Sequence, residues 1–246
     1  MRVAAVTYLP AGDMAVVVQF GETVDPVTNK SVRQFCSALA ALKLGWIIEI
    51  IPTYRSALIY YDCMKVQWPE MLKTLEGVVS SPPSTGPERN KVLVIPVQYG
   101  DDKGPDLSFV AQHSGLTEAE VVKIHTAPRY LVYMMGFSPG YAYMGGLDPR
   151  LFVPRLGTPR LVTPGGAVVM GGTQTGIHPT ETPGGMRIVG RTPLRLFDPS
   201  KEQPFLVEAG IMVEFKPIDK DEFDRIDKAA AEGTFEPEVY YEPERV

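Results

Sequence analysis

Glycine and proline punctuate this chain densely, with 23 residues of each among 246. Proline removes a backbone donor and glycine accepts turn conformations that other residues avoid, so the elements between them must be short. The punctuation is densest over residues 136–191. Over residues 81–91, three prolines and small polar residues break every helical or strand pattern, which predicts a linker. We therefore expect two domains, residues 1–80 and 92–218, and a terminal arm, residues 219–246.

The composition is that of an ordinary globular protein, because 44% of the residues are hydrophobic and 22% are charged. A net charge of -5 without runs of Lys or Arg offers nothing to a phosphate backbone, so we expect no nucleic-acid partner. We find neither a secretory signal nor an apolar stretch of about 18 residues, which predicts a cytoplasmic protein that does not bind membranes. Cys36 and Cys63 form no CxxC motif, and we expect no metal site.

The region before the linker alternates strands with helices. Apolar runs of strand type occupy residues 14–20, 46–51 and 56–61. Asp25 followed by Pro26 predicts the start of a first helix, and Gly45 its end. Pro69 opens a second helix. The order ββαββα predicts a small α/β sandwich.

The region after the linker is richer in strands. Thr117 and Glu120 form a capping box that starts one helix, and a shorter helix is expected over residues 104–115. Short apolar strands are expected at residues 92–97, 131–135, 167–170, 186–189, 194–197, 205–207 and 212–215. This rhythm predicts a closed β-barrel, and the whole chain is expected to be α+β.

Residues 219–246 carry ten acidic and four basic side chains. A helix is expected over residues 221–232, followed by an extended tail. This composition predicts a solvated arm, and a strap that binds a partner is the alternative.

Two motifs for catalysis fail. The chain lacks GxxxxGK[ST], so it has no P-loop. Residues 136–140 match the GxSxG nucleophile elbow, in which the residue after the serine donates its amide to the oxyanion hole. Pro139 has no amide hydrogen, which excludes serine-hydrolase chemistry for Ser138.

Three histidines are candidates for proton transfer near neutral pH. His113 lies at a helix end, where the helix dipole explains it. His125 leads into the glycine-rich block, and His178 lies in a polar loop of that block. His125 and His178 are therefore the stronger candidates, although either could be a structural histidine.

The glycine-rich block also carries arginines and aromatic residues. Under one interpretation its glycines only form turns between strands. Under a second interpretation they let backbone amides approach a ligand. Under the second interpretation, Arg155, Arg160 and Arg191 contact an anionic or carbonyl-bearing ligand. Phe137, Tyr141 and Tyr143 then form apolar walls.

Several segments together carry a resemblance to a known family. In the second half these are residues 95–97, 104–107, 125–128, 133–140, 145–148, 174–177 and 190–198. In the first half they are residues 13–15, 20–21, 24–25 and 52–56. Over residues 5–218 the chain closely resembles the family of 5-oxoprolinase B subunits, also called allophanate hydrolase subunit 1 or KipI-type kinase inhibitors. His178 and Met186 depart from it, since an aromatic residue and a tryptophan are expected there.

The resemblance implies a cyclophilin-like β-barrel for the second domain. It also implies that the chain acts together with the A and C subunits of 5-oxoprolinase. This complex would open 5-oxoproline to glutamate with hydrolysis of ATP, and the chain would have little activity alone. Direct contact between ATP and this chain is left open. The implied catalytic residue is His125. The implied substrate contacts are Phe137, Pro139, Gly140, Tyr143, Arg155, Arg160, Gln174, Thr175, His178 and Arg191.

Other functions remain open at this point. A KipI-type member binds and inhibits a sensor histidine kinase, which is a binding function rather than an enzymatic one. A third possibility is one part of an allophanate hydrolase or urea carboxyltransferase. Prolyl isomerase activity ranks last, because a shared barrel does not transfer function.

Overall fold

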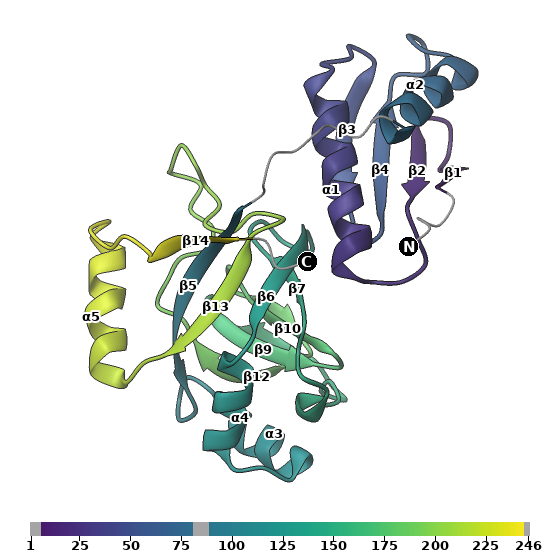
Figure 1. The fold of residues 1–246 in the computed structure, drawn as a ribbon. Coiled ribbons are helices and arrows are strands. Elements are labelled where there is room, and N and C mark those ends of the chain that lie inside the picture. The colour runs from purple at the N-terminus through teal and green to yellow at the C-terminus, as the bar shows by residue number, and fades with distance from the viewer. Residues whose placement is uncertain (1–5, 81–88, 244–246) are drawn as a thin grey trace. The chain divides into compact units, whose positions relative to one another are not determined.

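The computed structural model describes residues 6–80 and 89–243, so most of the expected linker lies outside the described residues (Figure 1). Contacts divide the chain into two compact units, residues 1–88 and 89–246. Each unit has its own hydrophobic cluster. The two units are described separately.

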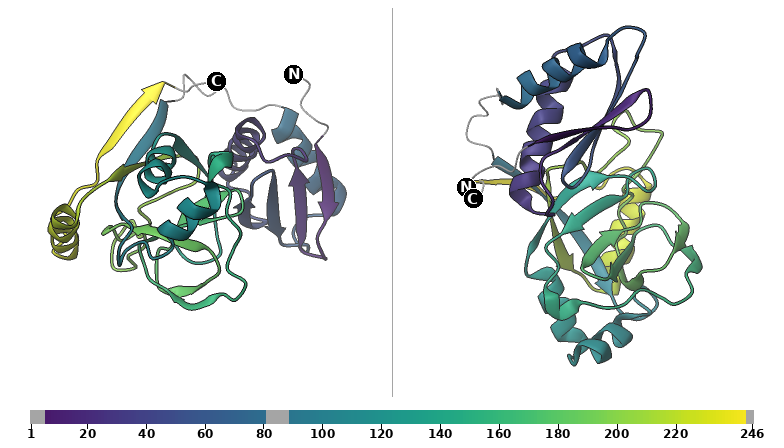
Figure 2. Two further views of the ribbon diagram at one scale, coloured as in Figure 1. Left: turned by 90° about the horizontal axis from the view of Figure 1, so that it is seen from below. Right: turned by 90° about the vertical axis from the view of Figure 1, so that its right-hand side faces the viewer.

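The first unit is a four-stranded antiparallel sheet, in the order β1-β2-β4-β3, with two helices on one face (Figures 1 and 2). Its elements are β1 (Thr7–Pro10), β2 (Ala15–Gln19), α1 (Pro26–Ala41), β3 (Ile47–Pro52), β4 (Ser56–Tyr61) and α2 (Trp68–Ser80). Alternate strand residues such as Val16, Val18 and Ile59 are buried against the helices. The observed order is the predicted ββαββα, although the sequence located only three of its four strands and β1 was not among them.

The first helix starts where the sequence predicts. Asp25 accepts a hydrogen bond from the Thr28 amide at 2.9 Å, and Pro26 is the first helical residue. The predicted end at Gly45 is wrong, because α1 stops at Ala41. Lys43 turns the chain with a φ of 48°, so a lysine and not the glycine supplies the left-handed residue.

The second unit contains a closed seven-stranded barrel, one strand added to that barrel, and a separate two-stranded ribbon (Figure 1). Its strands are β5 (Arg89–Tyr99), β6 (Arg129–Met135), β7 (Ala142–Gly145), β8 (Arg160–Thr163), β9 (Ala167–Gly171), β10 (Gln174–Ile177), β11 (Thr182–Gly184), β12 (Arg187–Arg191), β13 (Met212–Pro217) and β14 (Val239–Pro243). Its helices are α3 (Leu107–Ser114), α4 (Glu118–Thr126), the short η1 (Pro149–Leu151) and α5 (Lys220–Ala231). The α+β class with a barrel domain is confirmed.

Strand β5 closes the barrel. One of its edges pairs with β13 in parallel along residues 92–97. The other edge pairs with β12 at Gln98 and Tyr99, which joins the two ends of the sheet. The first half of that same edge, residues 89–93, pairs antiparallel with β14. The segment expected as a solvated tail therefore contributes a strand, and β5 begins within the expected linker.

Some strand assignments from the sequence are wrong. Residues 194–197 and 205–207 form no strand and share only an isolated bridge between Phe197 and Phe205. Conversely, β7, β8, β10 and β11 were not expected. Strands β8 and β11 form a separate two-stranded ribbon.

The helices of the second unit follow their local signals. Thr117 and Glu120 form both halves of the predicted capping box. Gly115 ends α3 in the left-handed conformation, with a φ of 66°. Helix α5 packs Phe223 and Ile226 into the barrel unit. Among the described residues, no helix has the length and apolar character needed to span a membrane.

Candidate functional site

The loop between β6 and β7 holds an exposed aromatic side chain on an unusual turn. The Ser138 amide donates to the Gly136 carbonyl at 2.8 Å, which closes a three-residue turn around Phe137. Phe137 has a φ of 66°, and 66% of its surface is exposed. A non-glycine residue held this way costs about 1–3 kcal/mol, and such strain concentrates at functional sites. The Ser138 hydroxyl is buried without a hydrogen-bond partner among the described residues.

A second turn follows at once. The Tyr141 amide donates to the Ser138 carbonyl at 3.0 Å, with Pro139 and Gly140 as the central residues. Proline suits the first central position, and the second requires the positive φ of 85° that Gly140 adopts. A Cβ on Gly140 would lie 2.9 Å from the Phe197 Cβ. The proline and glycine of this loop therefore determine its backbone conformation.

Aromatic rings gather beside this loop. Phe137 meets Tyr141 edge-on at 5.4 Å between centroids, and Tyr141 meets Tyr143 at 5.1 Å. Tyr141 also meets the His178 ring at 5.5 Å. The structure thus brings three predicted site residues, Phe137, Tyr143 and His178, to one place around Tyr141.

One ring nitrogen of His178 contacts a hydroxyl. The His178 Nδ1 lies 2.8 Å from the Thr182 Oγ1, and burial lowers the pKa of this histidine. Its Nε2 has no hydrogen-bond partner among the described residues. His178 is therefore a neutral imidazole with one nitrogen left for a further polar group.

The same loop also lines a cavity of about 760 Å³. Phe137, Pro139 and Gly140 contribute to its lining, together with residues 202–205 and 207–209. The charged residues of its lining are two glutamates, Glu202 and Glu208. This cavity suits an uncharged or cationic group better than an anionic substrate.

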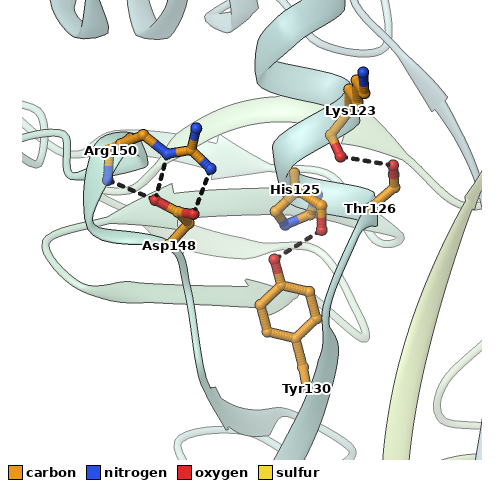
Figure 3. A network of polar contacts seen from close by, with 6 residues as sticks. All are labelled: Lys123, His125, Thr126, Tyr130, Asp148 and Arg150. Atoms are coloured by element: carbon orange, nitrogen blue, oxygen red, sulfur yellow. Dashed lines mark hydrogen bonds and ion pairs between the residues drawn. The ribbon is translucent and has the colours of Figure 1, made fainter.

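His125, the predicted catalytic residue, lies in the barrel core with no exposed surface. Its Nδ1 lies 2.8 Å from the Tyr99 hydroxyl, and its Nε2 lies 2.8 Å from the Thr175 hydroxyl. Its ring stacks on Phe215 at 4.7 Å. The Tyr130 hydroxyl donates to the main-chain oxygen of His125 (Figure 3).

These contacts define the tautomer of His125. The Thr175 hydroxyl donates its one hydrogen to the Val169 carbonyl, so it accepts from Nε2–H of His125. Nδ1 then accepts from the Tyr99 hydroxyl. Burial lowers the pKa of His125 to about 3, so the ring is neutral. In this arrangement His125 has no nitrogen free for substrate, and its catalytic role stays a prediction.

The three predicted arginines lie in different settings. Arg155 is exposed and donates to the Gln174 side-chain oxygen at 3.1 Å. Arg160 pairs with Asp106 at 2.7 Å, and the other oxygen of Asp106 accepts from the Ile188 amide. Asp106 was not among the predicted site residues, and its place before a helix was the only available signal.

Arg191 lies away from Arg155 along the barrel, at the end of β12. Its Nε donates to the Gly165 carbonyl at 2.9 Å. Its other guanidinium nitrogens have no partner among the described residues. The arginines therefore do not form one anion site.

Met186 joins several of the predicted residues on the outer face of the barrel. Its sulfur accepts from the Tyr141 hydroxyl at 3.7 Å, and its carbonyl accepts from Arg160 at 3.4 Å. A Cβ on Gly171 would touch both Met186 and Arg155. Tyr141 and Met186 thus connect the aromatic group to the Arg155–Gln174 pair, whereas Thr175 faces the opposite side, into the core.

A further cavity, of about 610 Å³, lies beside α4. Asp148 and Arg150 form an ion pair in its lining, and Arg150 holds the pKa of Asp148 at about 2 (Figure 3). No predicted site residue lines this cavity. The described residues also contain no cluster of three or more His, Cys, Asp or Glu that could hold a metal ion.

Comparisons with known proteins agree with this architecture. The family described as "Carboxyltransferase domain, subdomain C and D" matches residues 6–207. The B subunit of 5-oxoprolinase from Bacillus subtilis (strain 168) is 35% identical over 227 residues, covering 86% of this chain and 92% of that protein. The urea amidolyase of Lachancea kluyveri is 27% identical, covering 95% of this chain but 14% of that protein.

A solved structure, TTHA0988, has a TM-score of 0.75 at 32% identity and covers 83% of this chain. This chain spans 40% of the length of TTHA0988. Together with the closed barrel and the loop of residues 136–140, these matches confirm the resemblance seen in the sequence. The chain belongs to the family of 5-oxoprolinase B subunits, within the carboxyltransferase subdomain C and D family.

Proposed function

We propose that this chain is the B subunit of an ATP-dependent 5-oxoprolinase that opens the lactam of 5-oxoproline to glutamate. The observation that carries the proposal is the match to the B subunit of Bacillus subtilis 5-oxoprolinase, which extends over 92% of that protein. We further propose that the chain acts with the A and C subunits and has little activity alone.

The chemistry explains the need for ATP. A five-membered lactam is a poor electrophile, so transfer of the γ-phosphoryl group to its amide oxygen prepares it for attack. Water then adds to the ring carbon, and the C–N bond breaks with protonation of nitrogen, which leaves an acyl phosphate. A second water attacks this acyl phosphate and releases phosphate and the glutamate carboxylate. No P-loop assigns ATP to this chain, and we place ATP in the assembled complex.

Within this chain, the outer face around Tyr141 and Met186 is the proposed contact for substrate or for a partner's reacting loop. Arg155, oriented by Gln174, supplies the positive charge there. His178 offers its open Nε2 for a proton or a carbonyl group. His125, in the barrel core, acts as a positioning residue. Its hydrogen bond to Thr175 orients strand β10, which also carries Gln174.

The test is 5-oxoproline-dependent ATP hydrolysis by this chain alone and with candidate A and C subunits. Activity is expected only in the full mixture. Arg155→Gln should lower kcat/KM about tenfold or more while the complex still assembles. Arg225→Gln, which alters an exposed helix residue, is the matched control. A folded complex without turnover contradicts the proposal.

The second candidate function is half of a urea-processing carboxyltransferase. It is favoured by the 27% identity to a urea amidolyase over 95% of this chain. Urea-dependent turnover in the same mixture, with 5-oxoproline inactive, would support it. Inhibition of a sensor histidine kinase stays a prediction from the sequence, as does allophanate hydrolysis.

A further inference from the structure

A polar cavity of about 380 Å³ lies between the barrel and helix α5. Such a volume is near the lower end of small-molecule sites, about 300–1,000 Å³. It is built from glycine and proline turns on the barrel side and one face of α5 on the other. The lining residues are Lys103, Gly165, Gly166, Pro179, Arg191, Thr192, Pro193, Leu194, Arg195, Phe223, Asp224 and Asp227.

The barrel wall of this cavity is cationic. Arg191 is oriented by the Gly165 carbonyl, and its terminal nitrogens have no partner among the described residues. Arg195 is exposed and forms no hydrogen bond or ion pair with a described residue. Lys103 is paired with Asp102 at 2.7 Å and lies over the Phe223 ring.

The helix wall is acidic. Phe223 and Ile226 are buried and anchor α5 to the barrel unit. The spacing of α5 places Asp224 and Asp227 in the cavity lining, one turn apart. Asp224 also pairs with Lys220 at 2.6 Å, whereas Asp227 has no partner among the described residues.

Opposite charges therefore share one cavity without pairing across it. Among the described residues, no ion pair joins Asp224 or Asp227 to Lys103, Arg191 or Arg195. A simple anion entering the cavity would be repelled by the helix wall, and a simple cation by the barrel wall. A ligand that carries both charges at its two ends satisfies both walls.

We propose that this cavity binds a small zwitterion of the α-amino acid class. The carboxylate binds the terminal guanidinium nitrogens of Arg191, with Arg195 nearby. The ammonium group binds Asp227. This proposal rests on the proposed function only in the choice of the first probe. Glutamate is the product of the proposed reaction and is itself an α-amino acid.

The experiment is calorimetric titration of this chain alone with L-glutamate. Matched against it is 5-oxoproline, which has the carboxylate but no ammonium group. We expect saturable glutamate binding, and binding of 5-oxoproline weaker by about tenfold or more. Arg191→Gln and Asp227→Asn should each weaken glutamate binding by about tenfold. Asp221→Asn, on the same helix but outside the lining, should leave it unchanged.

Several results would overturn the proposal. One is a folded chain that does not bind glutamate or other α-amino acids. Another is equal affinity for 5-oxoproline, or tighter binding after Asp227→Asn, since either would indicate a plain anion site. Turnover is measured separately in the reconstituted mixture, so glutamate binding without oxoprolinase activity would refute the proposed function and leave this site standing.

Discussion

At the scale of single residues, the two buried histidines differ in what their ring nitrogens contact. His125 has both nitrogens bonded inside the core, whereas His178 has one nitrogen open beside the aromatic group. Position in the sequence favoured His125, because it precedes the glycine-rich block. Burial and hydrogen bonding are properties of the folded barrel and could not be seen from that position.

His125→Ala should destabilise the protein by about 3 kcal/mol or more. The change leaves a cavity in the core and removes the partners of the Tyr99 and Thr175 hydroxyls. Urea unfolding of the purified chain measures the loss. His113→Ala is the control, since His113 is exposed and contacts only the Phe109 ring among the described residues. An unchanged unfolding free energy for His125→Ala would contradict the buried network.

The same histidine predicts a pH dependence of stability. Burial lowers the pKa of His125 from 6.5 to about 3 in the folded chain. Between these values the unfolded chain binds a proton that the folded chain does not, so stability falls as pH is lowered from about 6.5 toward 3. Above pH 6.5, His125 is neutral in both states and does not change the free energy of unfolding. Unfolding curves of the parent and of His125→Gln, compared across this window, should differ in slope.

At the scale of elements, the β6–β7 hairpin loop depends on a glycine for two separate reasons. Gly140 has a φ of 85° and lies against Phe197 and Pro179, whereas Gly146 has a φ of 102° with open space around it. Gly146→Ala should therefore cost about 1 kcal/mol from strain alone, and Gly140→Ala clearly more. Thermal unfolding of both variants is the measurement. Equal losses of stability in the two variants would show that Phe197 moves aside at little energetic cost.

Strand β14 is attached by charge as well as by its ladder. Arg129 contacts Glu214 at 3.1 Å and also pairs with Glu242 of β14, while Tyr240 donates to Glu214. Arg129→Gln should lower stability by about 1 kcal/mol, with a smaller loss at high salt because the network is partly exposed. Guanidinium is itself a salt, so urea is the denaturant. A loss that does not depend on added salt would contradict an electrostatic role.

At the scale of the whole molecule, the main hydrophobic clusters of the two units contain different residues. Leu39 belongs to the first and Ile95 to the second, and both are fully buried. Calorimetry should therefore resolve two transitions. Leu39→Ala should lower the unfolding temperature of the first unit, and Ile95→Ala that of the second. Each substitution should reduce the free energy of unfolding of its own unit by about 2–5 kcal/mol. A single transition shifted by both variants would mean that the units unfold together.

Much of the fold follows from local signals in the chain. Asp25 with Pro26, and Thr117 with Glu120, predict helix starts because a cap is made by neighbouring residues. Strands with several consecutive apolar residues, such as β9 and β13, are also recognisable. Family membership follows from motifs of residues 95–198, and the comparisons confirm it.

The short strands could not be predicted in the same way. Strand β10 is Gln-Thr-Gly-Ile and β11 is Thr-Pro-Gly, and neither shows a clear alternation of apolar residues. Their conformation is set by ladder partners in β9 and β8. The apolar residues 194–197 and 205–207 show the converse, because Leu194, Leu196 and Val207 are buried in the core outside any strand.

The sequence by itself determined the α+β class, the helix caps and the family. Only the tertiary structure decided that His125 is a core residue, that Asp106 holds Arg160, and that β14 pairs with β5. It alone placed Arg191 and Asp227 across one cavity. The physical reason is range: caps and turns are made by residues a few positions apart, whereas burial, ion pairing and strand partners join residues that the sequence keeps far apart.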